Sequence, residues 1–171
     1  MKVGITGHQH LEDARDWEWV RHELHDLLVK LSKPLIGITC LAPGADSLFA
    51  RLLLEQDRSF EVVLPFPGYE LKLPADRRDD YQRLLEQASR VITLQRQKTD
   101  EESYLEAGKR VVNLSDLLIA VWDGKPAKGL GGTADVVKYA RRKQESIIHL
   151  DPIQHVVNGS LPFDSSNASR K

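Results

Sequence analysis

The sequence predicts an α/β fold of the Rossmann-like, doubly wound type, with a mainly parallel sheet and helices on both of its faces. Three observations predict this class. Short apolar runs alternate with segments of helical periodicity, turns rich in glycine or proline separate them, and 171 residues with 41% hydrophobic side chains are enough for one hydrophobic core. Strands that alternate with helices pair in parallel through right-handed crossovers.

The first strand and helix have clear local patterns. Residues 2–6 are an apolar run that ends at Gly7, where the missing side chain permits a sharp turn with open backbone donors. Between Trp17 and Leu31 the apolar residues recur every three or four positions, which is the period of one helix face, and Pro34 ends this helix. Residues 35–41 are apolar with little polar alternation, as expected for an interior strand covered on both faces.

The rest of the chain repeats this alternation. Residues 117–122, LLIAVW, are its strongest strand pattern. The other predicted helices lie at 45–56, 77–88, 101–113 and about 133–143, and the other predicted strands at 60–66, 91–94 and 146–150. Because the pattern ends near Asp151, we expect one domain over residues 1–151 and a polar, flexible tail over residues 152–171.

Charge and cysteine content limit the function classes. The formal net charge is −1 and the sequence pI is about 6.6, so there is no basic field to attract a nucleic acid or an anionic membrane, and we expect neither as a partner. The single cysteine, Cys40, cannot form an intrachain disulfide. No apolar run approaches the roughly 20 residues of a membrane span, and the N-terminus lacks a secretory h-region. These features predict a cytoplasmic protein.

Four loops are the predicted location of function, because ligands of open α/β sheets bind beyond the carboxyl ends of the strands. These loops are GHQH at 7–10, APGAD at 42–46, PFPGY at 65–69 and WDGKPAKGLGGT at 122–133. In the last loop Gly129, Gly131 and Gly132 lead into Thr133 and a helix. Unhindered backbone N–H groups at a helix N-terminus favour a phosphate, although such a turn also serves simply to join a strand to a helix.

The other loops contribute polar side chains. His8 and Gln9 leave the first strand with donors and acceptors for a base or a phosphate. Asp46 and Asp123 are candidates for binding ribose hydroxyls; the alternatives are a helix-capping role for Asp46 and a turn role for Asp123. The predicted ligand-binding residues are therefore Gly7, His8, Gln9, Gly44, Asp46, Asp123, Gly131, Gly132 and Thr133.

Metal and nucleophile chemistry are not predicted. The pairs His8 with His10 and His22 with His25 have no cysteine pair or ordered carboxylate set to complete a coordination shell. The sequence also lacks a nucleophile elbow for a serine or cysteine. We expect neither a metal nor a resident cofactor.

Four segments in this order make the sequence similar to the SLOG superfamily, the Rossmann-like group of LOG phosphoribohydrolases, the DprA Rossmann domain and the YpsA-like proteins. The segments are GITGHQHL at 4–11, APGADSLFARLL at 42–53, SDLLIAVWDG at 115–124 and GLGGTADVVKYA at 129–140, and the resemblance covers residues 1–150. It implies that Gly131, Gly132 and Thr133 hold the phosphate of a nucleotide or related ligand. The LOG pattern PGGxGTxxE places Val136 where those enzymes carry an active-site glutamate, and Asp135 lies on a different side of the helix.

Three function hypotheses follow. The leading one is a sensor or binding domain for a nucleotide or nucleotide-derived phosphate. The alternative is a nucleoside 5′-monophosphate N-glycosidase with Asp46 or Glu106 as its catalytic carboxylate. A DNA-processing partner like DprA is the third, and the absence of a basic surplus disfavours it. A homodimer is also predicted, because Trp17 and Trp19 point about 200° apart on a helix and one of them would then be exposed.

Overall fold

The protein is built around one twisted sheet. The computed structural model describes residues 1–31, 34–126, 129–159 and 161, and within them seven strands pair in the order β4-β3-β2-β1-β5-β6-β7. The strands are β1 (Lys2–Gly7), β2 (Ile36–Thr39), β3 (Ser59–Leu64), β4 (Arg90–Thr93), β5 (Leu117–Val121), β6 (Ile147–Asp151) and β7 (Val156–Asn158). All pairs are parallel except β6 with β7, which is antiparallel.

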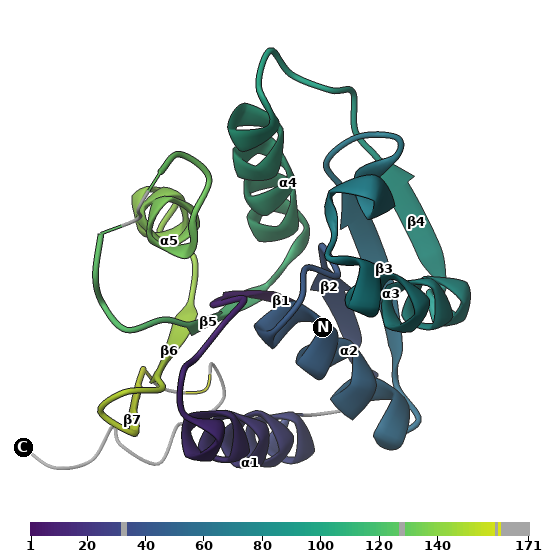
Figure 1. Cartoon of the computed structure of the whole chain (residues 1–171). Helices are drawn as coiled ribbons and strands as arrows, with labels where there is room; N and C mark the ends of the chain where they lie inside the picture. Colours follow the sequence, from purple (N-terminus) through teal and green to yellow (C-terminus); the bar gives the residue numbers. More distant parts are fainter. Residues whose placement is uncertain (32–33, 127–128, 160, 162–171) are drawn as a thin grey trace, which may run out of the picture.

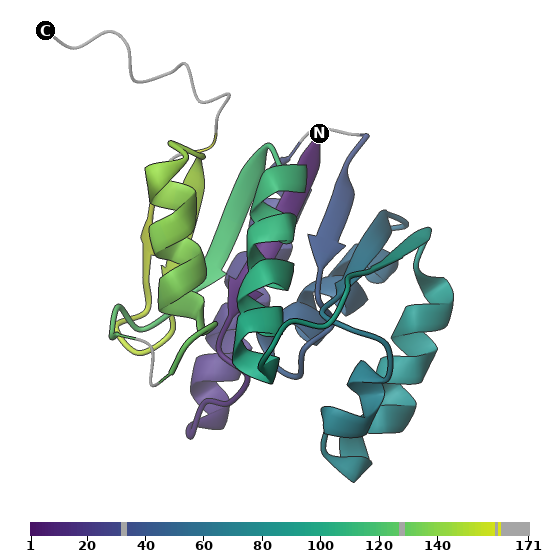
Figure 2. The same ribbon diagram turned by 90° about the horizontal axis from the view of Figure 1, so that it is seen from above.

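Helices cover both faces of the sheet. They are α1 (Ala14–Lys30), α2 (Ala45–Glu55), the 3-10 helix η1 (Tyr69–Lys72), α3 (Ala75–Gln87), α4 (Asp100–Leu114) and α5 (Thr133–Arg142). In Figure 1 α1 and α2 lie below the sheet and α4 and α5 above it, and Figure 2 shows α4 and α5 side by side against one face. The doubly wound prediction is confirmed.

Each face has its own hydrophobic core. Phe49, Phe60 and Ile119 belong to the core under α1 and α2, whereas Leu118 belongs to the core under α4 and α5. Neighbouring residues of β5 therefore point to opposite faces, and both faces are buried. This explains why the strand appears in the sequence as an uninterrupted apolar run.

The chain order reverses at the centre of the sheet, between β1 and β5. From β1 the chain proceeds outward through β2, β3 and β4, and then α4 carries it back across to β5. The loops that leave β1 and β5 thus turn to opposite faces and separate. Such a switch point opens a crevice at the carboxyl edge of the sheet.

The structure differs from the expected boundary at residue 151. The chain turns back after β6, because the Asp151 carboxylate accepts the backbone N–H groups of Ile153 and Gln154 at 2.9 and 3.0 Å, and β7 then pairs with β6. Most of the expected tail, residues 162–171 and Ser160, lies outside the described residues.

Both helix α1 tryptophans are half-buried. Trp17 and Trp19 pack against the larger core, and Trp19 also stacks on His155 with ring centroids 5.0 Å apart. Neither ring is the fully exposed one that motivated a homodimer, which stays a prediction for light scattering to test. Among the described residues, no helix combines the length and apolarity needed to cross a membrane.

Candidate functional site

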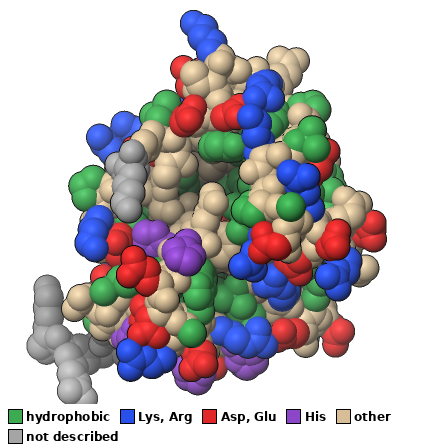
Figure 3. Space-filling view, in the orientation of Figure 1, with side chains coloured by type: hydrophobic (Ala, Val, Ile, Leu, Met, Phe, Trp, Pro, Cys, Tyr) green, Lys and Arg blue, Asp and Glu red, His purple; other side chains and the backbone are tan. Residues whose placement is uncertain are grey.

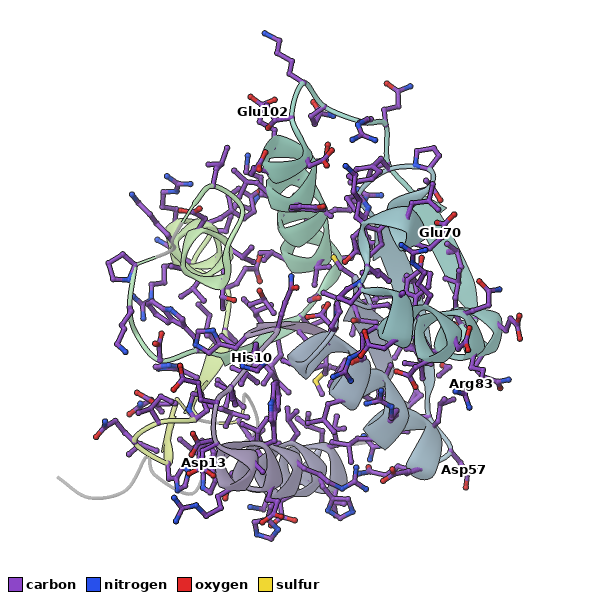
Figure 4. All side chains as sticks on the ribbon, viewed as in Figure 1. His10, Asp13, Asp57, Glu70, Arg83 and Glu102 are labelled. Carbon is purple, nitrogen blue, oxygen red and sulfur yellow. The ribbon has the colours of Figure 1, made fainter. Side chains whose placement is uncertain are left out.

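A large groove lies at the carboxyl edge of the sheet, beside the switch point between β1 and β5. Its volume is about 870 Å³, and Figure 3 shows the hollow on the face where the strands end. All four predicted loops contribute to its lining. The predicted residues that line it are Gly7, His8, Gln9, Asp46, Asp123, Gly131, Gly132 and Thr133. His10 also lines it and lies near the centre of this face in Figure 4.

His8 and Asp123 join the ends of the two central strands. The backbone N–H of Asp123 donates to Nε2 of His8 at 3.0 Å, and the Asp123 carboxylate lies 3.2 Å from the same nitrogen. Because Nε2 of His8 meets both the N–H and the carboxylate of Asp123, Nδ1 is the ring nitrogen left to meet a ligand.

Asp123 is ionised at neutral pH. Burial raises its pKa, but the backbone N–H of Lys125, the His8 ring and the Lys125 side chain act against burial and bring the pKa below its ordinary value. The carboxylate accepts the Lys125 backbone N–H at 3.1 Å, which is the turn role considered for it, and it also lines the groove. A carboxylate in this position can accept hydroxyl donors from a ligand.

Asp46 lines the groove but turns its charge into the protein. It is 6% exposed, and its Oδ2 accepts the Thr39 hydroxyl at 3.0 Å and the Cys40 backbone N–H at 2.9 Å. Burial raises its pKa to about 6, against the opposing effect of these hydrogen bonds. Asp46 therefore has a structural role in the first turn of α2, where it accepts donors from the loop after β2, but it is not the helix cap, because the N-cap of α2 is Gly44.

Gly44 lies outside the groove lining and shapes the loop behind it. Its φ is +88°, and a Cβ there would lie 2.5 Å from the carbonyl oxygen of His8 and 2.7 Å from Cα of Gln9. The adjacent N–H of Ala45 donates to that same carbonyl at 3.1 Å. Gly44 thus permits the backbones of two loops to touch, which is a different role from the ligand contact predicted for it.

The glycine-rich loop ends at the N-terminus of α5, which opens into the groove. Gly131 has φ +85° and donates its N–H to the Asp135 carboxylate at 3.0 Å. Gly132 is the N-cap, so it brings no side chain to the first turn, and Thr133 is the first helical residue. Within the part of the chain that the structure describes, the N–H groups of Thr133 and Ala134 have no acceptor. Both residues line the groove.

The second predicted catalytic carboxylate is remote from this arrangement. Glu106 pairs with Lys109 at 2.7 Å, its side chain is 45% exposed, and it does not line the groove. Helix α4 presents Tyr104, Ala107 and Gly108 to the groove instead, and Glu106 lies on a different side of the helix. We therefore assign Glu106 no catalytic role.

Position 136, where the LOG pattern has its glutamate, carries a buried valine in this protein. Val136 is 3% exposed and packs against Gly108, where an added Cβ would lie 2.4 Å from a Val136 methyl group. The position that carries the glutamate in the LOG pattern thus belongs to the contact between α4 and α5, and its valine side chain also forms part of the groove lining. Asp135 is engaged with the N–H of Gly131 and is not free to replace it.

Several groove residues were not predicted individually. Tyr69 belongs to the predicted loop 65–69, but nothing distinguished its ring from an ordinary core aromatic. Tyr104 lies on the charged helix α4, and Lys72 on η1, which the sequence did not predict. A tyrosine followed at three and four positions by Ala107 and Gly108 was the available signal, because these positions share a helix face. Among the described residues, no group of three metal-ligating side chains lies together.

Comparison of the fold with solved structures gives consistent matches. DNA processing protein A of Helicobacter pylori matches at 17% identity and a TM-score of 0.63 over 87% of this chain, and that of Streptococcus pneumoniae at 14% and 0.64 over 97%. The chain spans 64% and 53% of these two proteins. The molybdenum cofactor carrier protein of Chlamydomonas reinhardtii matches at 18% and 0.53, over 88% of this chain and 76% of that one. No family model matches the sequence, and no curated protein is similar enough in sequence to be recognised as a relative.

One expectation is overturned by these matches. The net charge led us to regard a nucleic acid as an unlikely partner, yet the fold is shared with the Helicobacter pylori protein, whose structure concerns its single-stranded DNA binding mode. Net charge is a poor guide because it averages over the whole surface, whereas a nucleic acid meets a local patch. Here Lys138, Arg141 and Arg142 are all exposed on α5. The exclusion of nucleic acids was therefore wrong.

Proposed function

We propose that this chain, which has the SLOG-type Rossmann-like fold, is a binding or sensor domain that holds a nucleotide or nucleotide-derived phosphate in the groove at the carboxyl edge of its sheet. The observation that carries this proposal is the N-terminus of α5. It brings the N–H groups of Thr133 and Ala134 into a groove at the switch point, with no acceptor among the described residues. Donors and a positive helix end favour an anion.

The remaining groups in the groove suit the rest of such a ligand. The Thr133 hydroxyl and Nδ1 of His8 add polar groups near the helix end. Asp123 is ionised and accepts hydrogen bonds, which is the property required to bind ribose hydroxyls. Lys72 and Lys125 also line the groove, where they pair with Asp100 at 2.7 Å and with Asp123 at 3.4 Å.

The N-glycosidase alternative depends on Asp46 alone. Its raised pKa and its place in the groove lining are what a general acid requires. Against it, both Thr39 and Cys40 donate to the same Asp46 oxygen, and Val136 occupies the position of the LOG glutamate. Binding without turnover is therefore the better-supported function. We also propose a cytoplasmic location, in which the single thiol of Cys40 stays reduced.

The test is a titration of the purified protein with nucleoside mono-, di- and cyclic phosphates. Thermal shift and calorimetry measure binding, and chromatography of the same mixtures measures release of the free base. We expect a saturable rise in melting temperature without base release. Base release that disappears in Asp46→Asn would establish the enzyme instead, and the absence of any shift across the panel would refute the proposed function.

A further inference from the structure

One wall of the groove is aromatic. We call Tyr69 of η1 and Tyr104 of α4 the aromatic wall; their ring centroids lie 6.1 Å apart at an interplanar angle of 69°. Phe66 packs behind both, at 6.0 Å from Tyr69 and 5.9 Å from Tyr104, and the guanidinium of Arg96 lies 4.3 Å from the Phe66 ring centroid. The wall is thus held from behind in a fixed orientation.

The aromatic wall adjoins the proposed phosphate site. A Cβ on Gly131 would lie 3.3 Å from Cβ of Tyr104 and 2.6 Å from the carbonyl oxygen of Glu101, so the glycine-rich loop lies directly against the first turns of α4. One turn further along α4, Ala107 and Gly108 line the groove with almost no side chain. Ala107 adds little bulk beside the ring, whereas the Cβ position of Gly108 faces Val136. Apolar side chains are visible in the hollow below α4 (Figure 3).

The hydroxyl of Tyr69 is an unused polar group in this wall. Tyr69 is 5% exposed and lines the groove, and its hydroxyl makes no hydrogen bond to another described residue. Burial first, and then the nearby Cys40 and Asp46, raise the pKa of this hydroxyl, so it stays protonated at neutral pH. A hydroxyl at the groove surface that makes no hydrogen bond to the protein can donate to or accept from a ligand.

We propose that the aromatic wall holds a planar nitrogen heterocycle of the ligand, with the Tyr69 hydroxyl at the edge of the ring and the phosphate at α5. The ligand class is then a nucleoside 5′-phosphate and not a sugar phosphate. This inference rests on the proposed function, because the phosphate site fixes the other end of the molecule. Stacking on a tyrosine tolerates every base, whereas a single hydroxyl discriminates between their edges.

Comparison of ligands on the unaltered protein tests this without any substitution. AMP, GMP, CMP and UMP are titrated beside ribose 5-phosphate, which carries the phosphate and the sugar but no ring. We expect at least one nucleotide to bind about tenfold or more tightly than ribose 5-phosphate, as base stacking on an aromatic side chain provides. Equal affinities would overturn the inference and leave the proposed function standing. Failure of all five to bind would overturn the inference, and failure of the di- and cyclic phosphates as well would overturn the proposed function.

Substitutions test which side chain provides the additional affinity for nucleotides. Tyr104→Leu removes a ring of the wall, and we expect it to lower nucleotide affinity to that of ribose 5-phosphate while ribose 5-phosphate still binds, which also shows that the variant is folded. Tyr104→Phe keeps the ring and restores nucleotide affinity. Tyr139→Leu is the matched control: Tyr139 does not line the groove, and its hydroxyl donates to Asn113 at 2.9 Å.

A separate substitution tests the hydroxyl of Tyr69. Tyr69→Phe keeps the ring and removes only the unpartnered group, so we expect the order of affinity among the four nucleotides to change while ribose 5-phosphate binding stays constant. If nucleotide affinity were the same in Tyr104→Leu as in the Tyr139→Leu control, the aromatic wall would have no part in binding.

Discussion

Two glycine-containing loops at the carboxyl edge of the sheet have opposite structures. APGAD at 42–46 and GLGGT at 129–133 each follow a strand, contain a glycine with positive φ and precede a helix. The first is closed: the N–H of Ala45 at its helix end donates to the His8 carbonyl, and the Asp46 carboxylate accepts donors from its own loop. The second is open, because the N–H groups of Thr133 and Ala134 have no acceptor among the described residues.

The difference shows what distinguishes a structural turn from a candidate binding loop. A glycine at a helix start permits close approach of another group, but either a second loop or a ligand can be that group. At 42–46 the backbone of residues 8 and 9 already occupies the space. At α5 the first-turn donors instead face a groove of about 870 Å³. Three predictions test the closed loop and its link to the open one.

The largest expected loss of stability follows substitution of Gly44. An alanine there has a forbidden φ of +88° and a Cβ 2.5 Å from the His8 carbonyl oxygen, so we expect Gly44→Ala to lose roughly 3 kcal/mol or more of unfolding free energy in urea. Gly124→Ala is the matched control, because Gly124 has φ +76° and open space around its Cβ position, and we expect it to lose about 1 kcal/mol. Equal losses would show that loop contact at Gly44 is unimportant.

The next largest expected effect is the pH dependence that Asp46 gives to the free energy of unfolding. Its folded-state pKa of about 6 lies above the ordinary value of 3.8, so the carboxyl contributes stability below about pH 4 and this contribution is lost as the pH rises through 6. The difference corresponds to about 3 kcal/mol at most. In Asp46→Asn the group does not titrate. We expect the stability of the native protein relative to this variant to fall between pH 4 and pH 7.

Urea denaturation at a series of pH values measures this difference directly. The comparison with the variant removes the contribution of the other carboxyl groups, which titrate in both proteins. If the free energies of unfolding of the two proteins changed in parallel with pH, Asp46 would not be a buried titrating carboxyl. The description of residues 42–46 as a closed loop would then be wrong.

A smaller effect is expected at His8, which links the two loops. Its carbonyl accepts the N–H of Ala45, and its ring accepts the N–H of Asp123 at the start of the open loop. His8→Ala leaves the half-buried N–H of Asp123 without its acceptor, and we expect a loss of about 1–2 kcal/mol. His10→Ala removes an exposed ring from the rim, and we expect a change within about 0.5 kcal/mol. Thermal melts of the two variants compare them, and a larger loss for His10→Ala would refute the link.

The features that sequence reasoning found depend on local patterns. The apolar run of β5, the helical period of α1 and the glycines before α5 each follow from neighbours in the chain, and the switch-point rule then placed the four loops together. Tyr104 and Glu106 differ by only two positions on α4, and which of them meets the groove depends on how α4 crosses from β4 to β5. The inward turn of Asp46 likewise depends on donors from residues 39 and 40. Strand β7 was missed because Val156–Asn158 is short and exposed and follows a polar turn.

The central claim is that the N-terminus of α5 binds the ligand phosphate, and the most direct measurement compares Gly132→Asp with Gly132→Asn. Gly132 has φ −75° and ψ 172°, which suits either residue as an N-cap, and the two side chains have the same shape and similar capping strength. They differ in one negative charge beside the proposed site.

Calorimetric titration of both variants with AMP and GMP, with melting temperatures as the check on folding, isolates that charge. Binding of the phosphate at this helix end predicts equal melting temperatures and a nucleotide affinity roughly tenfold or more lower for Gly132→Asp, because the carboxylate repels the phosphate at close range. Equal nucleotide affinities in the two variants would contradict it.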